Sequence, residues 1–200
     1  LNLNYNKLKF LPDNAFHGMH NLVILDLSQN ELHNIYGSPF QDLGSLQYLN
    51  MTFNYITSID DSTFVGLKKL HTLYWSGLYA DDISGSLKYI IGTPFVKLQS
   101  IRELTLTVDS DIDSVRGLFD GLEKLHHLII FVCCSPVDWS DFLCSLEYLQ
   151  SLEVLLGPIG LYSGNECFQQ MNLTDIRYVT FDPGYPPPAF HLFHNLTSVT

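Results

Sequence analysis

Apolar residues recur along the whole chain at a spacing close to 24 residues, and this spacing constrains the fold more than any other feature. Eight apolar positions align, and phenylalanine stands six residues before six of them. Each of the first seven is followed three residues later by a further leucine or valine. The aligned positions are Leu22, Leu46, Leu70, Ile101, Leu125, Leu152, Ile176 and Val199. Columns that stay in register over so many units indicate one tandem repeat across residues 1–200.

Each unit contains a short segment in which apolar and other residues alternate, as in Leu25, Asp26 and Leu27. A period of two predicts a β-strand with one buried face. One unit cannot bury its apolar side alone, whereas stacked units bury a continuous core and align their strands. We therefore expect an α/β repeat solenoid, a single array with a parallel concave β-sheet and a loop-rich convex side, uncapped at both ends.

Two units are longer than the others in this alignment, at 31 residues after Leu70 and 27 residues after Leu125. The array should therefore comprise about eight repeats and be irregular at 70–100 and 125–151. We expect the seven added residues of the first unit between Tyr79 and Thr93, and the three of the second around Cys133 to Cys144.

The early units carry asparagine eight residues after the aligned position, at Asn6, Asn30 and Asn54. An asparagine amide at a turn can hydrogen-bond backbone groups of its own and the neighbouring unit. The later units should lack this ladder, because other residues occupy the position: Leu78, Asp109, Cys133, Gly160 and Gly184.

Three Asn-x-Ser/Thr triplets, at Asn50, Asn172 and Asn195, predict N-glycosylation and hence a secreted or extracellular setting. Asn172 and Asn195 stand at unit junctions, opposite the strand, and should be exposed. Asn50 should project from the concave strand. There it is either glycosylated, which would block part of that face, or an unmodified polar residue.

The four cysteines allow three complete pairings. Cys144 and Cys167 occupy equivalent places in adjacent units of the alignment, so a Cys144–Cys167 disulfide is expected. Cys133 should then be a buried free thiol, and Cys134 has no assigned partner. A Cys134–Cys144 bridge inside one expanded unit remains an alternative.

The charge balance narrows the class of partner. Ten Lys+Arg stand against 21 Asp+Glu, for a formal net charge of −11. Attraction to phosphates and to anionic membrane surfaces comes mostly from lysine and arginine, so the overall charge opposes both. No apolar run reaches the ~18 residues of a membrane-spanning helix. Membrane attachment is therefore expected only through a span outside this chain.

Recognisable catalytic motifs are absent from the sequence. It contains no glycine-rich phosphate loop, no His-Glu-x-x-His and no nucleophile elbow. His17 and His20, like His191 and His194, are three residues apart but lack the further ligands of a usual metal site. We expect no enzymatic activity, no metal and no cofactor.

The segment Leu22-xx-Leu25-x-Leu27-xx-Asn30-x-Leu32 resembles the leucine-rich repeat, LxxLxLxxNxL. Phenylalanine before the leucines, as in Phe40-xx-Leu43-xx-Leu46, resembles the typical repeat class of extracellular receptors. With its irregular central units and scattered glycosylation triplets, the chain is most similar to an ectodomain fragment of a Toll-like receptor.

That resemblance implies a horseshoe on the extracellular side of a single-pass membrane receptor of innate immunity, at the cell surface rather than in endosomes. Such a receptor binds a microbial or endogenous ligand, forms homo- or heterodimers and signals through a cytoplasmic domain. Nucleic acid is disfavoured on this segment, because only Arg102 and Arg177 fall at exposed strand positions. The alternative is a static docking surface in an extracellular adhesion, guidance or antigen-binding repeat protein.

Concave side chains should lie two, four, six and seven residues after each aligned position. From the fourth unit onward many of these are apolar and should form one patch: Val108, Ile129, Phe131, Val132, Val154, Leu156 and Ile159. Its predicted rim consists of Tyr74, Glu103, His127 and Tyr178. A contiguous apolar patch usually marks an interaction site, here for a ligand or a partner chain. Alternatively, the residues between Tyr79 and Thr93 or a flanking loop cover it.

Overall fold

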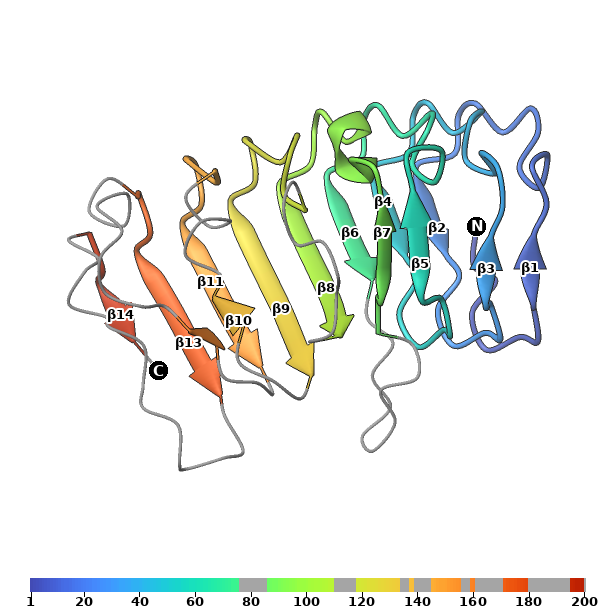
Figure 1. The fold of residues 1–200 in the computed structure, drawn as a ribbon. Helices are drawn as coiled ribbons and strands as arrows, with labels where there is room; N and C mark the ends of the chain where they lie inside the picture. Colours follow the sequence, from blue (N-terminus) through green and yellow to red (C-terminus); the bar gives the residue numbers. More distant parts are fainter. Residues whose placement is uncertain are drawn as a thin grey trace.

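A parallel sheet of eight strands runs the length of the molecule (Figure 1). The computed structural model describes residues 1–75, 86–109, 118–133, 137–138, 145–155, 159–160, 171–179 and 195–199. The strands lie in the order β14-β13-β11-β9-β8-β6-β4-β2, so each successive unit adds its strand to the same edge. They are β2 (Ile24–Asp26), β4 (Tyr48–Asn50), β6 (Thr72–Trp75), β8 (Glu103–Asp109), β9 (His127–Cys133), β11 (Ser151–Leu155), β13 (Asp175–Val179) and β14 (Ser198–Val199).

The opposite side of the solenoid consists of loops and short parallel pairs of strands. These are β1 (Phe10–Leu11) with β3 (Asn34–Ile35), β5 (Ser58–Asp60) with β7 (Tyr89–Ile91), and β10 (Val137–Asp138) with β12 (Ile159–Gly160). The one helix in the described part of the chain is a 3₁₀ turn at Pro94–Lys97. Within those residues, no helix is long and apolar enough to cross a membrane. The expected parallel-sheet solenoid is confirmed, although its described units contain no α-helix.

The apolar columns of the sequence form a single core. A leucine column runs across the sheet because each member pairs in register with the next, as Leu49 does with Leu73 and Leu104 with Leu128. On the other side of the core, Phe16 stacks on Phe40 and Phe64 on Phe95, with ring centroids 6.0 and 5.4 Å apart. Burial of each such side chain contributes about 1.5–3 kcal/mol, a gain that single units lack and stacked units share.

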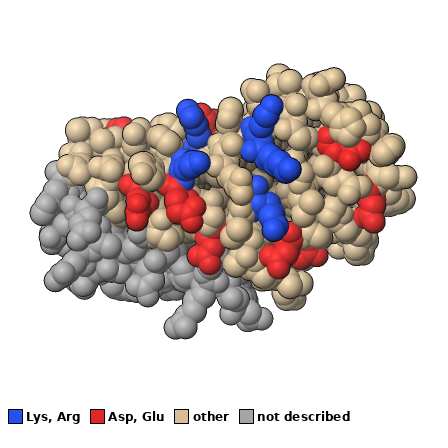
Figure 2. All heavy atoms as spheres, turned by 90° about the horizontal axis from the view of Figure 1, so that it is seen from above, with Lys and Arg blue, Asp and Glu red and all other residues tan. Residues whose placement is uncertain are grey.

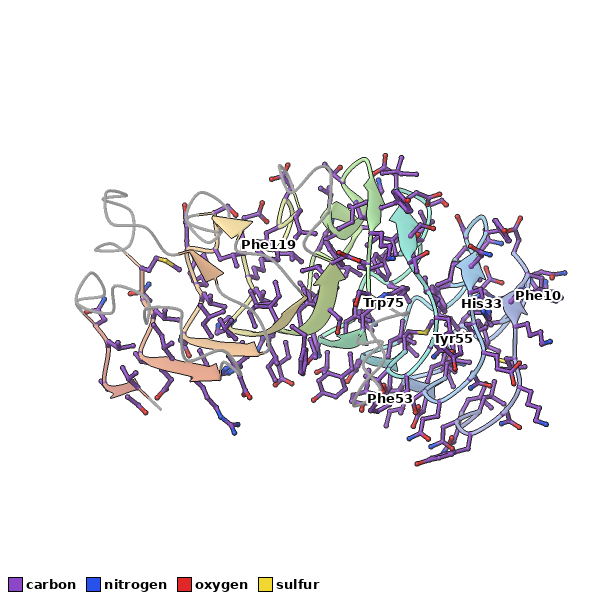
Figure 3. The ribbon with its side chains drawn as sticks, turned by 60° about the horizontal axis from the view of Figure 1, so that its bottom comes forward. Phe10, His33, Phe53, Tyr55, Trp75 and Phe119 are labelled. Atoms are coloured by element: carbon purple, nitrogen blue, oxygen red, sulfur yellow. The ribbon has the colours of Figure 1, made fainter. Side chains whose placement is uncertain are left out.

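The asparagine ladder is present in the early units. The Asn54 side chain is buried; its Oδ1 accepts from the Leu32 N–H at 3.1 Å, and its Nδ2 donates to the carbonyls of Leu27 and Met51, both at 3.0 Å. Asn30 makes the equivalent bonds one unit earlier. One residue before each ladder asparagine, Tyr5, Gln29 and Phe53 have φ near +55°, which closes the turn at the end of the strand. Beside these turns, His33 stacks on Tyr55 at 5.1 Å (Figure 3).

The predicted register of the later units is wrong by three residues. Leu152 pairs with Leu128, one full 24-residue unit earlier, so Leu149 and not Leu152 aligns with Leu125. The pairing of Leu152 with Ile176 carries the same shift into the next unit. The predicted 27-residue unit therefore does not exist. Leucine recurs every third residue from Leu143 to Leu155, so a slip by three keeps every apolar column filled, and only backbone pairing separates the two registers.

The 31-residue unit is real. Trp75 pairs with Leu106, and Ile90 pairs with Ile59, so the seven added residues fall between Trp75 and Ile90, against the predicted limits of Tyr79 and Thr93. Leu87 is buried beside β8, where it forms a parallel bridge with Val108.

A candidate ligand-binding face

Strands β8 and β9 are seven residues long, against three for β2 and β4, and they enlarge the middle of the sheet. The early strands end at the turn before asparagine, whereas β8 and β9 continue through that position and pair Asp109 with Cys133. Alternation along an uninterrupted strand then sends every second side chain away from the core. We call this outward side of the eight-stranded sheet the sheet face; it is the concave face of the sequence prediction.

A hollow of about 240 Å³ lies on the sheet face where β6, β8, β9 and β11 run side by side. Its floor includes backbone of the buried leucines Leu104 and Leu128. The side chains of the sheet face that line it are Tyr74, Glu103, Thr105, His127, Ile129, Ser151 and Glu153. The hollow is thus mixed in character, with an aliphatic and an aromatic side chain among carboxylates, hydroxyls and an imidazole.

The two carboxylates of the hollow have different partners. Glu153 forms an ion pair with Arg177 of the next strand, with 3.0 Å between Oε1 and Nη1. Glu103 is exposed, and Thr72 Oγ1 donates a hydrogen bond to its Oε2 at 3.4 Å. Among the described residues Glu103 has no cationic partner, so its charge is available to a ligand. Between them, Thr105 is 8% exposed and presents a hydroxyl at the base of the hollow.

Aromatic side chains border the hollow on the side of the early units. Tyr48 and Tyr74 lie on β4 and β6, with ring centroids 5.5 Å apart and planes at 87°. Burial raises the pKa of the Tyr48 phenol, and the neighbouring Tyr74 and Asp26 add to that rise. The phenol therefore stays protonated over the physiological range and offers a hydrogen-bond donor next to the ring faces.

The structure places five of the predicted site residues on the sheet face. Tyr74, Glu103, His127 and Ile129 line the hollow, and Phe131 lies half-buried two residues further along β9.

Two other predicted patch residues belong to the core. Val108 is 0% and Val154 is 2% exposed. Val108 points inward because β8 continues straight instead of turning, so the residue seven after the aligned position falls on the inner side of the sheet. Val154 points inward because the true register of its unit differs by three residues from the predicted one. The continuous apolar patch of the sequence prediction is therefore replaced by a smaller, more polar surface.

The remaining predicted patch residues are placed only by register or not at all. Val132 pairs with Val108, and Tyr178 pairs with Val154, so both occupy register positions whose described partners are core residues. Ile159 lies in β12, which pairs with β10 and not with the eight-stranded sheet. Leu156 lies outside the described residues.

Sequence reasoning missed three residues of the hollow: Thr105, Ser151 and Glu153. Thr105 is polar, and the patch was predicted from apolar positions. Ser151 and Glu153 were hidden by the register slip, since both precede or follow Leu152 in the leucine run. Counting units of 24 backwards from Leu152 to Leu128 was the signal that could have found them.

The predicted glycosylation residues lie on or beside the sheet. Asn50 is half-buried on β4, where its Oδ1 accepts hydrogen bonds from the Thr52 N–H and hydroxyl at 3.1 and 2.8 Å. Asn172 and Asn195 are exposed just before β13 and β14, on the sheet edge rather than opposite the strands. Their amides donate to the Glu147 and Met171 carbonyls, each in the preceding unit. Glycosylation of the three residues stays a prediction.

The cysteine assignments stay predictions as well. Cys134, Cys144 and Cys167 lie outside the described residues, and Cys133 is placed only as the last residue of β9, paired with Asp109.

The histidine pair near the amino terminus surrounds a carboxylate. His17 Nδ1 lies 2.9 Å from Asp42 Oδ2, and His20 Nδ1 lies 3.1 Å from the Asp42 carbonyl. The Gly18 N–H donates to the same carboxylate and lowers the pKa of Asp42, and both histidines add to that effect. His191 and His194 are outside the described residues; within these, no three His, Cys, Asp or Glu side chains form a possible metal site.

Comparisons with known proteins identify the fold. The family model for the leucine-rich repeat matches residues 1–56, whereas no curated protein matches the chain in sequence. Internalin C2 from Listeria monocytogenes superimposes with a TM-score of 0.65 and 18% identity, over 97% of this chain and 76% of its own. TLR13, in complex with ssRNA13, gives 0.61 and 21% over 100% and 35%. Human 5T4, also called Wnt-activated inhibitory factor 1 or trophoblast glycoprotein, gives 0.60 and 20% over 90% and 68%.

At these identities the likeness concerns the fold, and this chain spans about a third of the TLR13 chain. The repeat columns, the asparagine ladder and the parallel sheet all agree with the matched family model and with the three neighbours. The chain is a leucine-rich-repeat solenoid that resembles a Toll-like receptor in fold.

Proposed function

We propose that this chain is a ligand-binding part of the ectodomain of an innate immune receptor of the Toll-like type, and that its ligand docks on the sheet face around the hollow. The observation that carries the proposal is the enlarged middle of the sheet, where β8 and β9 run straight through the ladder position and create a lined hollow. The match of the entire chain to TLR13 supports it.

The chemistry of the hollow suits a protein ligand better than a nucleic acid. Its charged groups are Glu103, Glu153 and His127, and the Arg177 guanidinium next to it is already paired with Glu153. Carboxylates repel phosphates, whereas Glu103 beside Tyr74 offers a lysine or arginine side chain both a counter-ion and an aromatic face. A microbial or host protein that presents such a side chain would fit, and so would a second receptor chain.

A second function, a static docking surface in an adhesion or host-contact protein, is favoured by the equally good match to internalin C2 and 5T4. In that case the same sheet face would bind its partner without transmitting a signal.

The gene that encodes this chain separates the two functions. We expect the transcript to continue after Thr200 into a membrane span and a cytoplasmic Toll/interleukin-1 receptor domain. Immunoglobulin modules, a lipid anchor or a stop codon without any membrane span would contradict the receptor function and support the docking surface.

A further inference from the structure

A group of basic side chains lies on the edge of the solenoid where the strands of the large sheet begin (Figure 2). In the view of Figure 2, lysine and arginine gather in the middle of this edge, and the acidic residues surround them. Five exposed residues of three consecutive units stand in the turns that lead into β6, β8 and β9: Lys68, Lys69, Lys97, Arg102 and Lys124. We call these five residues the edge strip.

The edge strip differs from the other basic residues in its ion pairs. Outside it, Lys9 pairs with Glu31, Lys88 with Asp109 and Arg177 with Glu153. Among the described residues, by contrast, no carboxylate forms an ion pair with any of the five side chains of the strip. Half of the ten lysines and arginines of a chain with net charge −11 are thus concentrated on one edge with their charges available.

The turns that carry the strip are held against one another. The Arg102 N–H donates to the His71 carbonyl at 2.8 Å, and the His126 N–H donates to the Arg102 carbonyl at 2.9 Å. The Ser100 hydroxyl donates to the Lys68 carbonyl at 2.9 Å. Neighbouring strands lie about 4.8 Å apart, so the strip spans roughly 10 Å across its three units. Its charges are therefore arranged in advance and need little ordering to meet a linear polyanion.

Acidic residues bound the strip at one end. Asp120 and Glu123 lie beside Lys124, and the three line a hollow of about 630 Å³ together with Val96, Gln99, Gly121 and Tyr148. Glu103 follows Arg102 but belongs to the sheet face. The part of the strip formed by Lys68, Lys69, Lys97 and Arg102 is free of carboxylates among the turn residues described, apart from Glu103, and so is its most positive part.

We propose that the edge strip binds a sulfated polysaccharide laid across the turns before β6, β8 and β9. A row of exposed lysines with an arginine attracts a chain of closely spaced anions through charge, and the guanidinium can bind a sulfate through two donors. The exposed polar side chains between the charges, Gln99 and His71, and the half-buried Ser100 are hydrogen-bond partners for sugar hydroxyls. The acidic surface elsewhere repels a polyanion and restricts it to the strip.

A polysaccharide is favoured over a nucleic acid by two observations. Proteins that bind single-stranded nucleic acids combine basic grooves with aromatic side chains on which bases stack. None of the five residues of the strip, nor Gln99, Ser100 and His71 between them, offers a phenyl, phenol or indole ring. The choice also rests on the extracellular setting proposed above, where sulfated polysaccharides occur. A chain bound on the edge leaves the sheet face open, so both sites can be occupied together.

The test measures binding of the intact protein to immobilised heparin as a function of salt. One variant combines Lys68→Gln, Lys69→Gln and Arg102→Gln. Its matched control combines Lys7→Gln, Lys9→Gln and Lys88→Gln, which removes the same charge from exposed positions elsewhere. We expect the unaltered protein to bind heparin at about 0.15 M salt, and the strip variant to lose about tenfold in affinity with a salt slope lower by about 2–3. The control should change affinity by less than about twofold.

Three results would overturn the proposal: no binding of the unaltered protein at that salt concentration, equal losses in the two variants, or tighter binding of single-stranded DNA than of heparin through the same residues. The last result would assign the strip to a nucleic acid. Unchanged thermal unfolding of both variants shows that the comparison is between folded proteins. Because heparin binding by this chain does not depend on any domain encoded after Thr200, this proposal and the proposed receptor function can fail separately.

Discussion

Asn54 shows how one side chain can serve two units of the solenoid. Its amide bonds the Leu32 N–H and the Leu27 carbonyl of the preceding unit, as well as the Met51 carbonyl of its own. These backbone groups lie at the end of a strand, where no further strand pairing is available to them. A buried backbone group without a partner costs about 1–3 kcal/mol, so a single amide stabilises the whole turn.

We expect Asn54→Ala to lower the free energy of unfolding by about 3 kcal/mol, because it leaves buried groups of two units without partners. Asn6→Ala is the matched control. Asn6 occupies the same repeat position, but it is exposed and bonds only the Leu3 and Asn4 carbonyls of its own unit. Its loss should cost less than about 1 kcal/mol, since water can replace it. Equal losses for the two variants in urea unfolding would show that the ladder bonds contribute nothing beyond their own turn.

Asp60 makes the stability of one convex turn depend on pH. Burial alone would raise the pKa of its carboxyl, but hydrogen bonds from the Ser62 hydroxyl and N–H and from the Thr63 side chain outweigh that effect and lower it. A carboxyl whose pKa is lowered on folding stabilises the protein above its unfolded pKa, about 3.9. That contribution disappears as the pH falls through the folded pKa.

Asp60→Asn should therefore be less stable than the unaltered protein at pH 7, by about 1–2 kcal/mol, with the difference shrinking below pH ~4. Ser62→Ala should remove part of the same pH dependence, because its hydroxyl donates to Asp60 Oδ1 at 2.6 Å. Unfolding curves measured from pH 7 down to pH 2.5 check this; a difference that stays constant over the range would contradict the assigned role of the carboxylate.

At the scale of elements, the pairing of β9 with β11 decides which side chains reach the sheet face. The leucine run from Leu143 to Leu155 fills the core columns in either of two registers that differ by three residues. In the register observed, Ser151 pairs with His127 and Leu152 with Leu128. Val154 then packs in the core, and Glu153 reaches the hollow.

Val154→Asp and Ser151→Asp test this register directly. Val154→Asp should unfold or aggregate the protein, because an unpaired carboxylate would enter the core. Ser151→Asp should change stability by less than about 0.5 kcal/mol, as surface substitutions usually do. The sequence alignment makes the opposite prediction for Val154, which it places on the sheet face. A soluble Val154→Asp variant with an unchanged melting temperature would therefore restore the 27-residue unit.

For the whole molecule, two surfaces at right angles carry different chemistry. The sheet face holds the hollow with its carboxylates and aromatic rings, whereas the adjoining edge holds the five basic residues of the edge strip. Opposite charge on neighbouring surfaces separates their partners, because each surface repels the ligands that the other attracts.

The sheet face can be tested with a matched pair of double variants in the intact protein. We expect Ile129→Ser with Phe131→Asp to abolish ligand response or self-association, since both side chains lie on the sheet face of β9. Tyr89→Asp with Ile91→Ser alters two exposed residues with the same spacing on β7, on the opposite side of the solenoid. It should leave ligand response and self-association unchanged. If the β9 variant folds and keeps both properties, the sheet face around Phe131 is not the interaction site.

The amino-acid sequence by itself determined the solenoid, the parallel sheet and the asparagine ladder. A repeat must bury the same columns in every unit, so periodicity alone identifies them. Tyr74, Glu103, His127 and Ile129 could be placed on the sheet face because the first register is unambiguous from Leu22 to Leu128. Only the tertiary structure decided the places of Val108, Glu153 and Val154. Whether a strand turns or continues, and which leucine of an evenly spaced run starts a unit, is settled by backbone hydrogen bonds between neighbouring units, and these bonds leave no trace in the apolar pattern.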